Sequence, residues 1–378
     1  MTDDSRFSVL AAPGVRGLQP YVPGKSIEAL EREYGVSDTL KLASNENPLG
    51  PPDGALAAIR AGASDLHLYP DGTGHELKLA LAERHGVQPE QITLGNGSNE
   101  LLVLLAETFL TPADEAVYDA HAFLVYALAV QEASAIARVA SSLSPAHPDQ
   151  PLGHDPTALI QCCNDQTRLM YVANPNNPTG TWLDEQNLRA LLEQLPPDAL
   201  LCLDEAYAEY SEHADYPDGA ALVAEYPNLV VTRTFSKAYA LAGLRIGYAI
   251  SHPGVAELMN RVRQPFNTNT LAQAAALAAL QDSKFIVRSR RLNADGLVQL
   301  TEGLRELGLG VPASAGHFVL ADQNRPVMPV YEALLRAGII VRPEANNGLP
   351  NHQRITVGLP KQNARLLAAL PACLEVGL

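Results

Sequence analysis

Short apolar runs alternate with amphipathic stretches between residues 90 and 250, and this alternation predicts an α/β domain. Such a domain is built around a mostly parallel sheet, and its ligands bind beyond the carboxyl ends of the strands. The predicted strands are Ile92–Gly95, Glu115–Tyr118, Leu169–Ala173, Leu200–Leu203, Leu229–Thr232 and Arg245–Ile250. The predicted helices between them include Glu100–Phe109, Phe123–Ala133 and Asp184–Gln194.

The pattern changes after Thr270, where a second, smaller α+β domain is expected. A long helical region with a break near Asp282 is followed by short strands and helices. The elements predicted there are the helical region Ala272–Glu306, strand His317–Leu320, helix Val330–Ala337, strands Ile339–Arg342 and Arg354–Val357, and a last helix from Gln362.

The first 45 residues are rich in proline and glycine around one predicted helix, Ile27–Tyr34, which Ser26 caps and Gly35 ends. We expect this arm to join the small domain or to reach a partner subunit. The predicted division is therefore an arm and part of the small domain in 1–45, a large domain in 46–275 and a small domain in 276–378.

Composition narrows the function classes. A chain of 378 residues exceeds what one core usually supports, and its net charge of −15 argues against nucleic acid or an anionic membrane as a partner. Acidic residues near the start and the lack of a spanning apolar run predict a cytoplasmic protein. The four cysteines form no CxxC pair, so no metal site is expected.

The string from Thr234 to Gly247 is the strongest candidate for chemistry. It follows a predicted strand, and its lysine, Lys237, can form a Schiff base with a carbonyl once burial lowers its pKa. Thr234, Ser236 and Arg245 offer hydroxyls and a bidentate guanidinium group to a phosphate.

Asp204 and Tyr207 follow another apolar strand. Pyridoxal phosphate (PLP) needs a carboxylate at its pyridine nitrogen, and Asp204 is placed for that role at the carboxyl end of the strand. Tyr207 is placed to bond the phenolic oxygen of the cofactor. The Asp204-Glu205 pair also fits a Walker B strand, but the sequence has no GxxxxGK[ST] string to accompany it.

Two turns complete the set of candidates. Asn177 lies in a proline-bounded turn after the strand that ends at Ala173, so it is a second donor to the phenolic oxygen. The turn 95–100 joins a strand to a helix, and its small residues let backbone amides approach a phosphate. In the alternative interpretation Ser98 is simply the N-cap of that helix.

Together these strings resemble the fold-type-I PLP-dependent aminotransferases. Five more strings narrow the resemblance to the histidinol-phosphate aminotransferases, and the similarity extends from about residue 14 to the last helix. These strings occupy residues 21–24 (YVPG), 42–50 (LASNENPLG), 69–72 (YPDG), 341–343 (VRP) and 348–360.

The resemblance implies a role for each matching residue. Lys237 would be the Schiff-base lysine and proton shuttle, and Asp204 would pair with the pyridine nitrogen. The remaining cofactor contacts implied are Asn177 and Tyr207 at the phenolic oxygen, Phe123 stacked on the ring, Ser98, Asn99, Thr234, Ser236 and Arg245 at the phosphate, and Tyr69 reaching that phosphate from a partner subunit. The implied substrate contacts are Arg354 as the anion-binding arginine, with Arg342, Asn47 and a partner's Tyr21 as helpers.

Two strings depart from the family pattern. Residues 119–123 lack the usual proline-containing turn, so the stacking role of Phe123 rests on its position alone. His317 stands where the family has asparagine before an aromatic residue. It either alters the small-domain side of the pocket or fills a slot beside a strand.

The function implied is transamination of histidinol phosphate with 2-oxoglutarate in histidine biosynthesis, by a homodimer with shared active sites. A broad aromatic amino-acid aminotransferase would use the same residues. A PLP lyase of the threonine-phosphate decarboxylase type shares the architecture and also binds a phosphorylated substrate. A PLP-binding regulator would need a fused DNA-binding domain, and the arm before residue 45 is too short and not basic.

Overall fold

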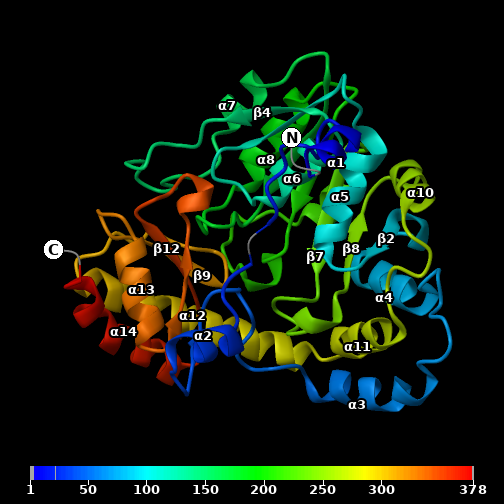
Figure 1. Cartoon of the computed structure of the whole chain (residues 1–378). Helices are drawn as coiled ribbons and strands as arrows, with labels where there is room; N and C mark the ends of the chain where they lie inside the picture. Colours follow the sequence, from blue (N-terminus) through cyan, green and yellow to red (C-terminus); the bar gives the residue numbers. More distant parts are fainter. Residues whose placement is uncertain (1–3, 22, 377–378) are drawn as a thin grey trace.

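The computed structural model describes residues 4–21 and 23–376 (Figure 1). Its large domain is built on a seven-stranded sheet of order β2-β8-β7-β6-β5-β3-β4. The strands are parallel except β8, which is antiparallel to β2 and β7. Their bounds are β2 Ile92–Gly95, β3 Glu115–Asp119, β4 Ile136–Ala140, β5 Thr167–Ala173, β6 Leu200–Asp204, β7 Leu229–Thr234 and β8 Gly247–Ile250.

All six strands predicted for this sheet are present, with each end within two residues of its predicted position. The mostly parallel sheet is confirmed as well. The edge strand β4 was missed: Arg138 interrupts its apolar residues, and four of its five residues are exposed. Val22, in the string from Tyr21 to Gly24, lies outside the described residues.

Apolar side chains cover both faces of the sheet, which explains why its central strands are almost continuously apolar. Leu203 and Val231 pack into one core cluster, whereas their neighbours Cys202 and Val230 pack into the cluster on the other face. The helices of this domain are α3 Asp53–Gly62, α4 His75–His85, α5 Ser98–Phe109, α6 Val125–Glu132, α7 Pro156–Gln161, α8 Glu185–Gln194, α9 Gly219–Leu222, α10 Pro253–Val262 and α11 Thr270–Gln281, and α1 Asp4–Leu10 precedes them. Across the described residues, every helix is too short or too polar to cross a membrane.

The small domain has an antiparallel sheet of order β11-β12-β9 packed with helices (Figure 1). The predicted strand Ile339–Arg342 is in fact two short strands in different sheets. The first, β10, pairs with β1, whereas the second, β11, pairs with β12. The elements are β1 Leu40–Lys41, β9 Phe318–Asp322, α13 Met328–Arg336, β10 Ile339–Ile340, β11 Arg342–Pro343, β12 His352–Thr356 and α14 Pro360–Leu374.

The N-terminal arm joins the small domain through the parallel β1–β10 pair. Its helix α2, Ile27–Tyr34, has the predicted bounds. The Ser26 hydroxyl accepts a hydrogen bond from the Ala29 amide at 3.1 Å, and Gly35 ends the helix in the left-handed region with φ 66°. Both predicted caps are therefore present.

The break predicted at Asp282 is also present, since Asp282 caps the long helix α12, Ser283–Glu306. The beginning of α12 contributes Phe285 to the large-domain core, and its end contributes Leu300 and Leu304 to the small-domain core. In Figure 1 the helix runs from the neighbourhood of α11 to that of α13 and α14. The predicted division between residues 275 and 276 stays a prediction, and α12 belongs to both cores.

Candidate active site

A cavity of about 330 Å³ lies beyond the carboxyl ends of β5, β6 and β7 and is closed by residues of the arm and the small domain. It collects most of the residues predicted from sequence. Those that line it are Tyr21, Ser98, Asn99, Phe123, Asn177, Asp204, Tyr207, Thr234, Ser236, Lys237, Arg245, Arg342 and Arg354.

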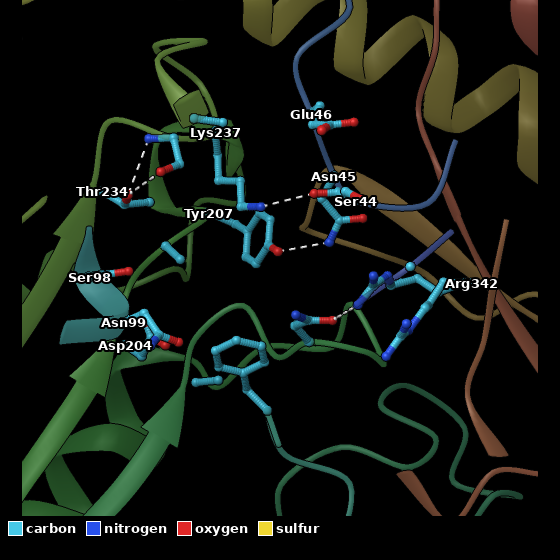
Figure 2. Close-up of a pocket in the computed structure, with 18 of the residues that line it drawn as sticks. Ser44, Asn45, Glu46, Ser98, Asn99, Asp204, Tyr207, Thr234, Lys237 and Arg342 are labelled. Atoms are coloured by element: carbon cyan, nitrogen blue, oxygen red, sulfur yellow. Dashed lines mark hydrogen bonds between the residues drawn. The ribbon is translucent and has the colours of Figure 1, made fainter. Parts of the chain in front are cut away.

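Lys237 lies in the turn that follows β7, with its amine inside the cavity (Figure 2). Its Nζ donates to the Ser44 carbonyl oxygen at 3.1 Å and lies 5.7 Å from the centre of the Tyr207 ring. Burial, together with the nearby Arg354 guanidinium, lowers the pKa of Lys237 to about 8. A larger share of this amine is therefore neutral near pH 7, as a Schiff-base nucleophile requires.

Asp204 ends β6 at the base of the cavity, where it is almost completely buried. Its carboxylate accepts hydrogen bonds from the Tyr126 hydroxyl at 2.9 Å and the Thr232 hydroxyl at 3.2 Å. Burial raises the pKa of Asp204, and these two hydrogen bonds oppose the rise. A buried carboxylate in this state favours a positively charged partner at its open side. Sequence reasoning missed Tyr126.

An anion cradle forms where α5 begins. Gly97, with φ 85°, is the N-cap residue, which corrects the alternative placing of Ser98 there. A Cβ at Gly97 would collide with Arg245, and one at Gly247 would lie 2.5 Å from the Ser98 amide nitrogen. The two glycines therefore let the guanidinium group, the start of α5 and the Ser236 hydroxyl approach one another, and Arg245 Nη1 lies 3.3 Å from Ser236 Oγ.

Arg342 lies at the end of the cavity away from Ser98 (Figure 2), and Arg354 also lines the cavity. They are register partners on the antiparallel strands β11 and β12, so both guanidinium groups serve one site. Arg354 donates to the Asn177 amide oxygen and, at 2.8 Å, to the Ala43 carbonyl oxygen. Arg342 lies 5.8 Å from the centre of the Tyr21 ring. Such a pair suits a phosphate or carboxylate.

Tyr21 lines the cavity of its own chain, which corrects the expectation that a partner subunit supplies it. Asn47, by contrast, is not among the described residues that line the cavity. Its amide donates to the Ala238 carbonyl oxygen at 3.0 Å and to the Ser289 hydroxyl at 2.7 Å. Asn47 thus holds the segment after Lys237 in place.

Two residues of the NENP string, Asn45 and Glu46, line the cavity, and sequence reasoning did not single out Asn45. Asn45 is buried, with φ 54°, and its Nδ2 donates to the Tyr207 hydroxyl at 2.8 Å (Figure 2). Its backbone amide and its Oδ1 both bond the Thr356 hydroxyl, at 2.9 and 3.0 Å. Asn45 therefore joins the large domain to β12 at the cavity.

Tyr69 lies outside this cavity with 83 % of its surface exposed, and its ring stacks on Phe266 at 4.7 Å between centres.

His317 is buried between Asn293 Oδ1, at 2.8 Å, and the Glu46 carbonyl oxygen, at 3.3 Å. Burial lowers the pKa of His317 to about 3, so it is neutral and fills a slot behind the cavity wall. This placement agrees with the second of its two interpretations.

Comparison with known proteins agrees with this geometry. The family model "Aminotransferase class I and II" matches residues 37–370. Histidinol-phosphate aminotransferase 2 of Pseudomonas fluorescens is 52 % identical over 366 residues, which are 96 % of this chain and 97 % of that protein. The Pseudomonas aeruginosa protein of the same name is 51 % identical, with 97 % and 98 % covered. The crystal structure of histidinol-phosphate aminotransferase from Sinorhizobium meliloti in complex with pyridoxal-5'-phosphate has 30 % identity and a TM-score of 0.87, with 97 % of each chain covered.

Proposed function

We propose that this chain, which belongs to the class I and II aminotransferases and among them to the histidinol-phosphate aminotransferases, transfers the amino group of histidinol phosphate to 2-oxoglutarate with PLP as cofactor. The products are imidazole-acetol phosphate and glutamate. The observation that carries the proposal is the pairing of Arg342 with Arg354 across β11 and β12, in the same cavity as Lys237.

Three features of the cavity fit PLP. The cradle between Gly97 and Gly247, which a Cβ would fill, suits the phosphate, and the buried Asp204 suits the pyridine nitrogen. The Lys237 amine, with its lowered pKa, suits the aldehyde. When bound, PLP supplies that aldehyde and a ring that takes up the electron pair of a deprotonated carbon.

The protein's own groups then perform orientation and proton transfer. With PLP bound, Lys237 Nζ would hold its aldehyde and, when free, would move a proton at the substrate carbon that bears the amine. Asp204 would keep a proton on the ring nitrogen, held in place by the hydrogen bonds from Tyr126 and Thr232. Tyr207 and Asn177 would hold the phenolic oxygen.

The two arginines explain how one site serves both half-reactions. A carboxylate needs one bidentate arginine, whereas a dianionic phosphate benefits from two. Arg354 would bind the phosphate of histidinol phosphate or a carboxylate of 2-oxoglutarate in turn, and Arg342 would add its charge for the phosphate.

Turnover assays distinguish this proposal from the two rival enzymes. We expect the purified protein to transaminate histidinol phosphate with a kcat/KM at least tenfold above that for phenylalanine, and to leave threonine phosphate intact. An equal or greater kcat/KM for phenylalanine would favour the aromatic aminotransferase. Release of CO₂ from threonine phosphate would favour the lyase.

We also propose a homodimer in which Tyr69 reaches the cofactor phosphate of the partner subunit. An exposed apolar patch around Tyr69, formed with Leu66, Leu68 and Phe266, supports an interface there. Hybrids of Lys237→Ala and Tyr69→Phe subunits would contain one intact site, so their activity should exceed that of either parent. Hybrid activity no higher than that of the parents would refute the shared site.

A further inference from the structure

We propose that Glu344 sets the charge of the two-arginine site and thereby determines its selectivity between phosphate and carboxylate ligands. The inference deepens the proposed function and rests on it, because the site is taken to bind both classes of anion in turn. Glu344 would act through Arg354 and is thus a specificity-determining positioning residue.

Glu344 is completely buried directly behind the arginine pair. It follows β11, and its Oε1 lies 3.5 Å from Nη1 of Arg354. Its other oxygen, Oε2, accepts a hydrogen bond from the side chain of Asn347 in the short 3₁₀ helix Ala345–Asn347. Its backbone amide donates to the His352 carbonyl oxygen on β12 at 3.0 Å. Main chain and side chain are both anchored, so the carboxylate stays beside Arg354.

The contact between Glu344 and Arg354 is one of charge. Oε1 receives no hydrogen bond from any described residue, although it lies within ion-pair distance of the guanidinium group. A carboxylate that served only to orient Arg354 would be expected to accept a hydrogen bond from it in the bidentate geometry usual for this pair. The main effect of Oε1 on the site is therefore electrostatic.

Three charged or polar side chains face Glu344. Arg354 approaches from β12, Arg342 from β11 and Asn347 from the following turn. From the large domain, His121 reaches the same turn, with Nδ1 3.0 Å from the Asn347 carbonyl oxygen. Burial raises the pKa of Glu344 above its ordinary value, and the two arginines and Asn347 offset only part of that rise. When Glu344 is ionised, two guanidinium charges and one carboxylate leave the site with a single positive charge.

A net charge of plus one balances the single negative charge of a carboxylate, but only half of the charge of a phosphate dianion. Coulomb energy scales with the charge of the ligand, so the repulsion from Glu344 weakens a dianion about twice as strongly as a monoanion. Glu344 would thus moderate phosphate binding so that the carboxylate of the second substrate competes for the same arginines. Neutralising Glu344 should shift the preference toward phosphate.

The test is Glu344→Gln in the holoenzyme at pH 8, with each half-reaction followed by the absorbance of the bound cofactor. The amine donors are histidinol phosphate, and glutamate with its singly charged α-carboxylate. We expect the ratio of kcat/KM for histidinol phosphate over glutamate to rise about tenfold, the effect of one unit charge in a partly buried site. Glu344→Asp should keep the ratio near that of the wild type.

Glu332→Gln is the matched control, because Glu332 is half exposed on α13 and pairs only with Arg336 of the same helix among the contacts of the described residues. The ratio should not change in this variant. A ratio in Glu344→Gln within twofold of the wild type, or one that falls, would overturn the proposal. Should Glu344→Gln fail to fold, Asn347→Leu removes the hydrogen bond that favours the ionised carboxylate. It should move the ratio in the same direction by a smaller factor, and an unchanged or lower ratio would overturn the proposal equally.

The same experiment separates this inference from the proposed function. If the wild type does not react with histidinol phosphate, the proposed function fails. In that case inorganic phosphate and acetate, as inhibitors of the glutamate half-reaction, report on the site directly. Glu344→Gln should then strengthen inhibition by phosphate more than inhibition by acetate, and equal changes would overturn the inference.

Discussion

Replacing Asn45 should weaken the contact between the two domains at the cavity. Asn45 donates to the Tyr207 hydroxyl and bonds the Thr356 hydroxyl, and it does so from a left-handed backbone conformation with φ 54°. Asn45→Ala removes the side-chain bonds and also puts alanine in the left-handed region, which alanine adopts at a greater penalty than asparagine. Asn45→Gly removes the same bonds without that penalty.

The magnitudes follow from these contacts. A buried hydroxyl left without its partner is destabilising by about 1–3 kcal/mol, and here the Tyr207 hydroxyl loses Asn45. The Thr356 hydroxyl keeps its bond from the Asn45 backbone amide, so its loss is smaller. The left-handed conformation adds about 1 kcal/mol for alanine. We expect Asn45→Ala to lower the free energy of unfolding by about 3 kcal/mol and Asn45→Gly by about 2 kcal/mol.

Urea unfolding of the apoprotein, followed by circular dichroism, measures both variants against the wild type. The free energy of unfolding should decrease in the order wild type, Asn45→Gly, Asn45→Ala. Equal losses in both variants would show that the backbone at Asn45 stores no strain. A loss below about 0.5 kcal/mol in both would refute the importance of the hydrogen bond to Tyr207.

Three further predictions concern the cavity. Borohydride reduction of the holoenzyme should fix the cofactor on Lys237, and a peptide map with the adduct on another lysine would contradict the site. Arg342→Ala should lower kcat/KM for histidinol phosphate roughly ten- to a hundred-fold and that for glutamate much less. Arg354→Ala should lower kcat/KM for both substrates. Equal losses for the two substrates in Arg342→Ala would remove the argument for a phosphate site. Because the folded pKa of Lys237, about 8, lies below its ordinary value of 10.5, the unfolded chain holds the extra proton between these pH values and higher pH stabilises the fold. From pH 8 to 10 the apoprotein should therefore gain about 2 kcal/mol relative to Lys237→Met, as measured by urea unfolding, and a flat difference would contradict the lowered pKa.

Most of the sheet and much of the cavity could be predicted because the relevant signals are local. Asp204 and Lys237 each follow an apolar run, and parallel strands end at one edge of a sheet, so their convergence follows from topology. The edge strand β4 has a weaker signal, because Arg138 interrupts its apolar residues and only Ala140 of the five is buried.

The errors arose where the direction of a side chain depends on distant packing. The NENP string contains two asparagines, and only the fold determines that Asn45 enters the cavity while Asn47 turns toward Ser289. Tyr126 lies in a predicted helix, but its bond to Asp204 joins residues 78 positions apart. Glu344 follows the predicted Val341-Arg342-Pro343 string, and its burial beside Arg354 depends on the pairing of β11 with β12.

Because α12 packs into both cores, the rotation of one end of this helix relative to the other sets how the two halves of the cavity face each other. Its 24 residues span about 36 Å as one continuous rod. Inserting a single residue near its middle would leave Phe285 in one core and Leu304 in the other, but would rotate one end against the other by about 100°. Each domain would then retain its own interior while Arg354 and Lys237 no longer faced the same ligand. The length of this helix is thus constrained by the spacing of the two halves of the site as well as by the stability of either core.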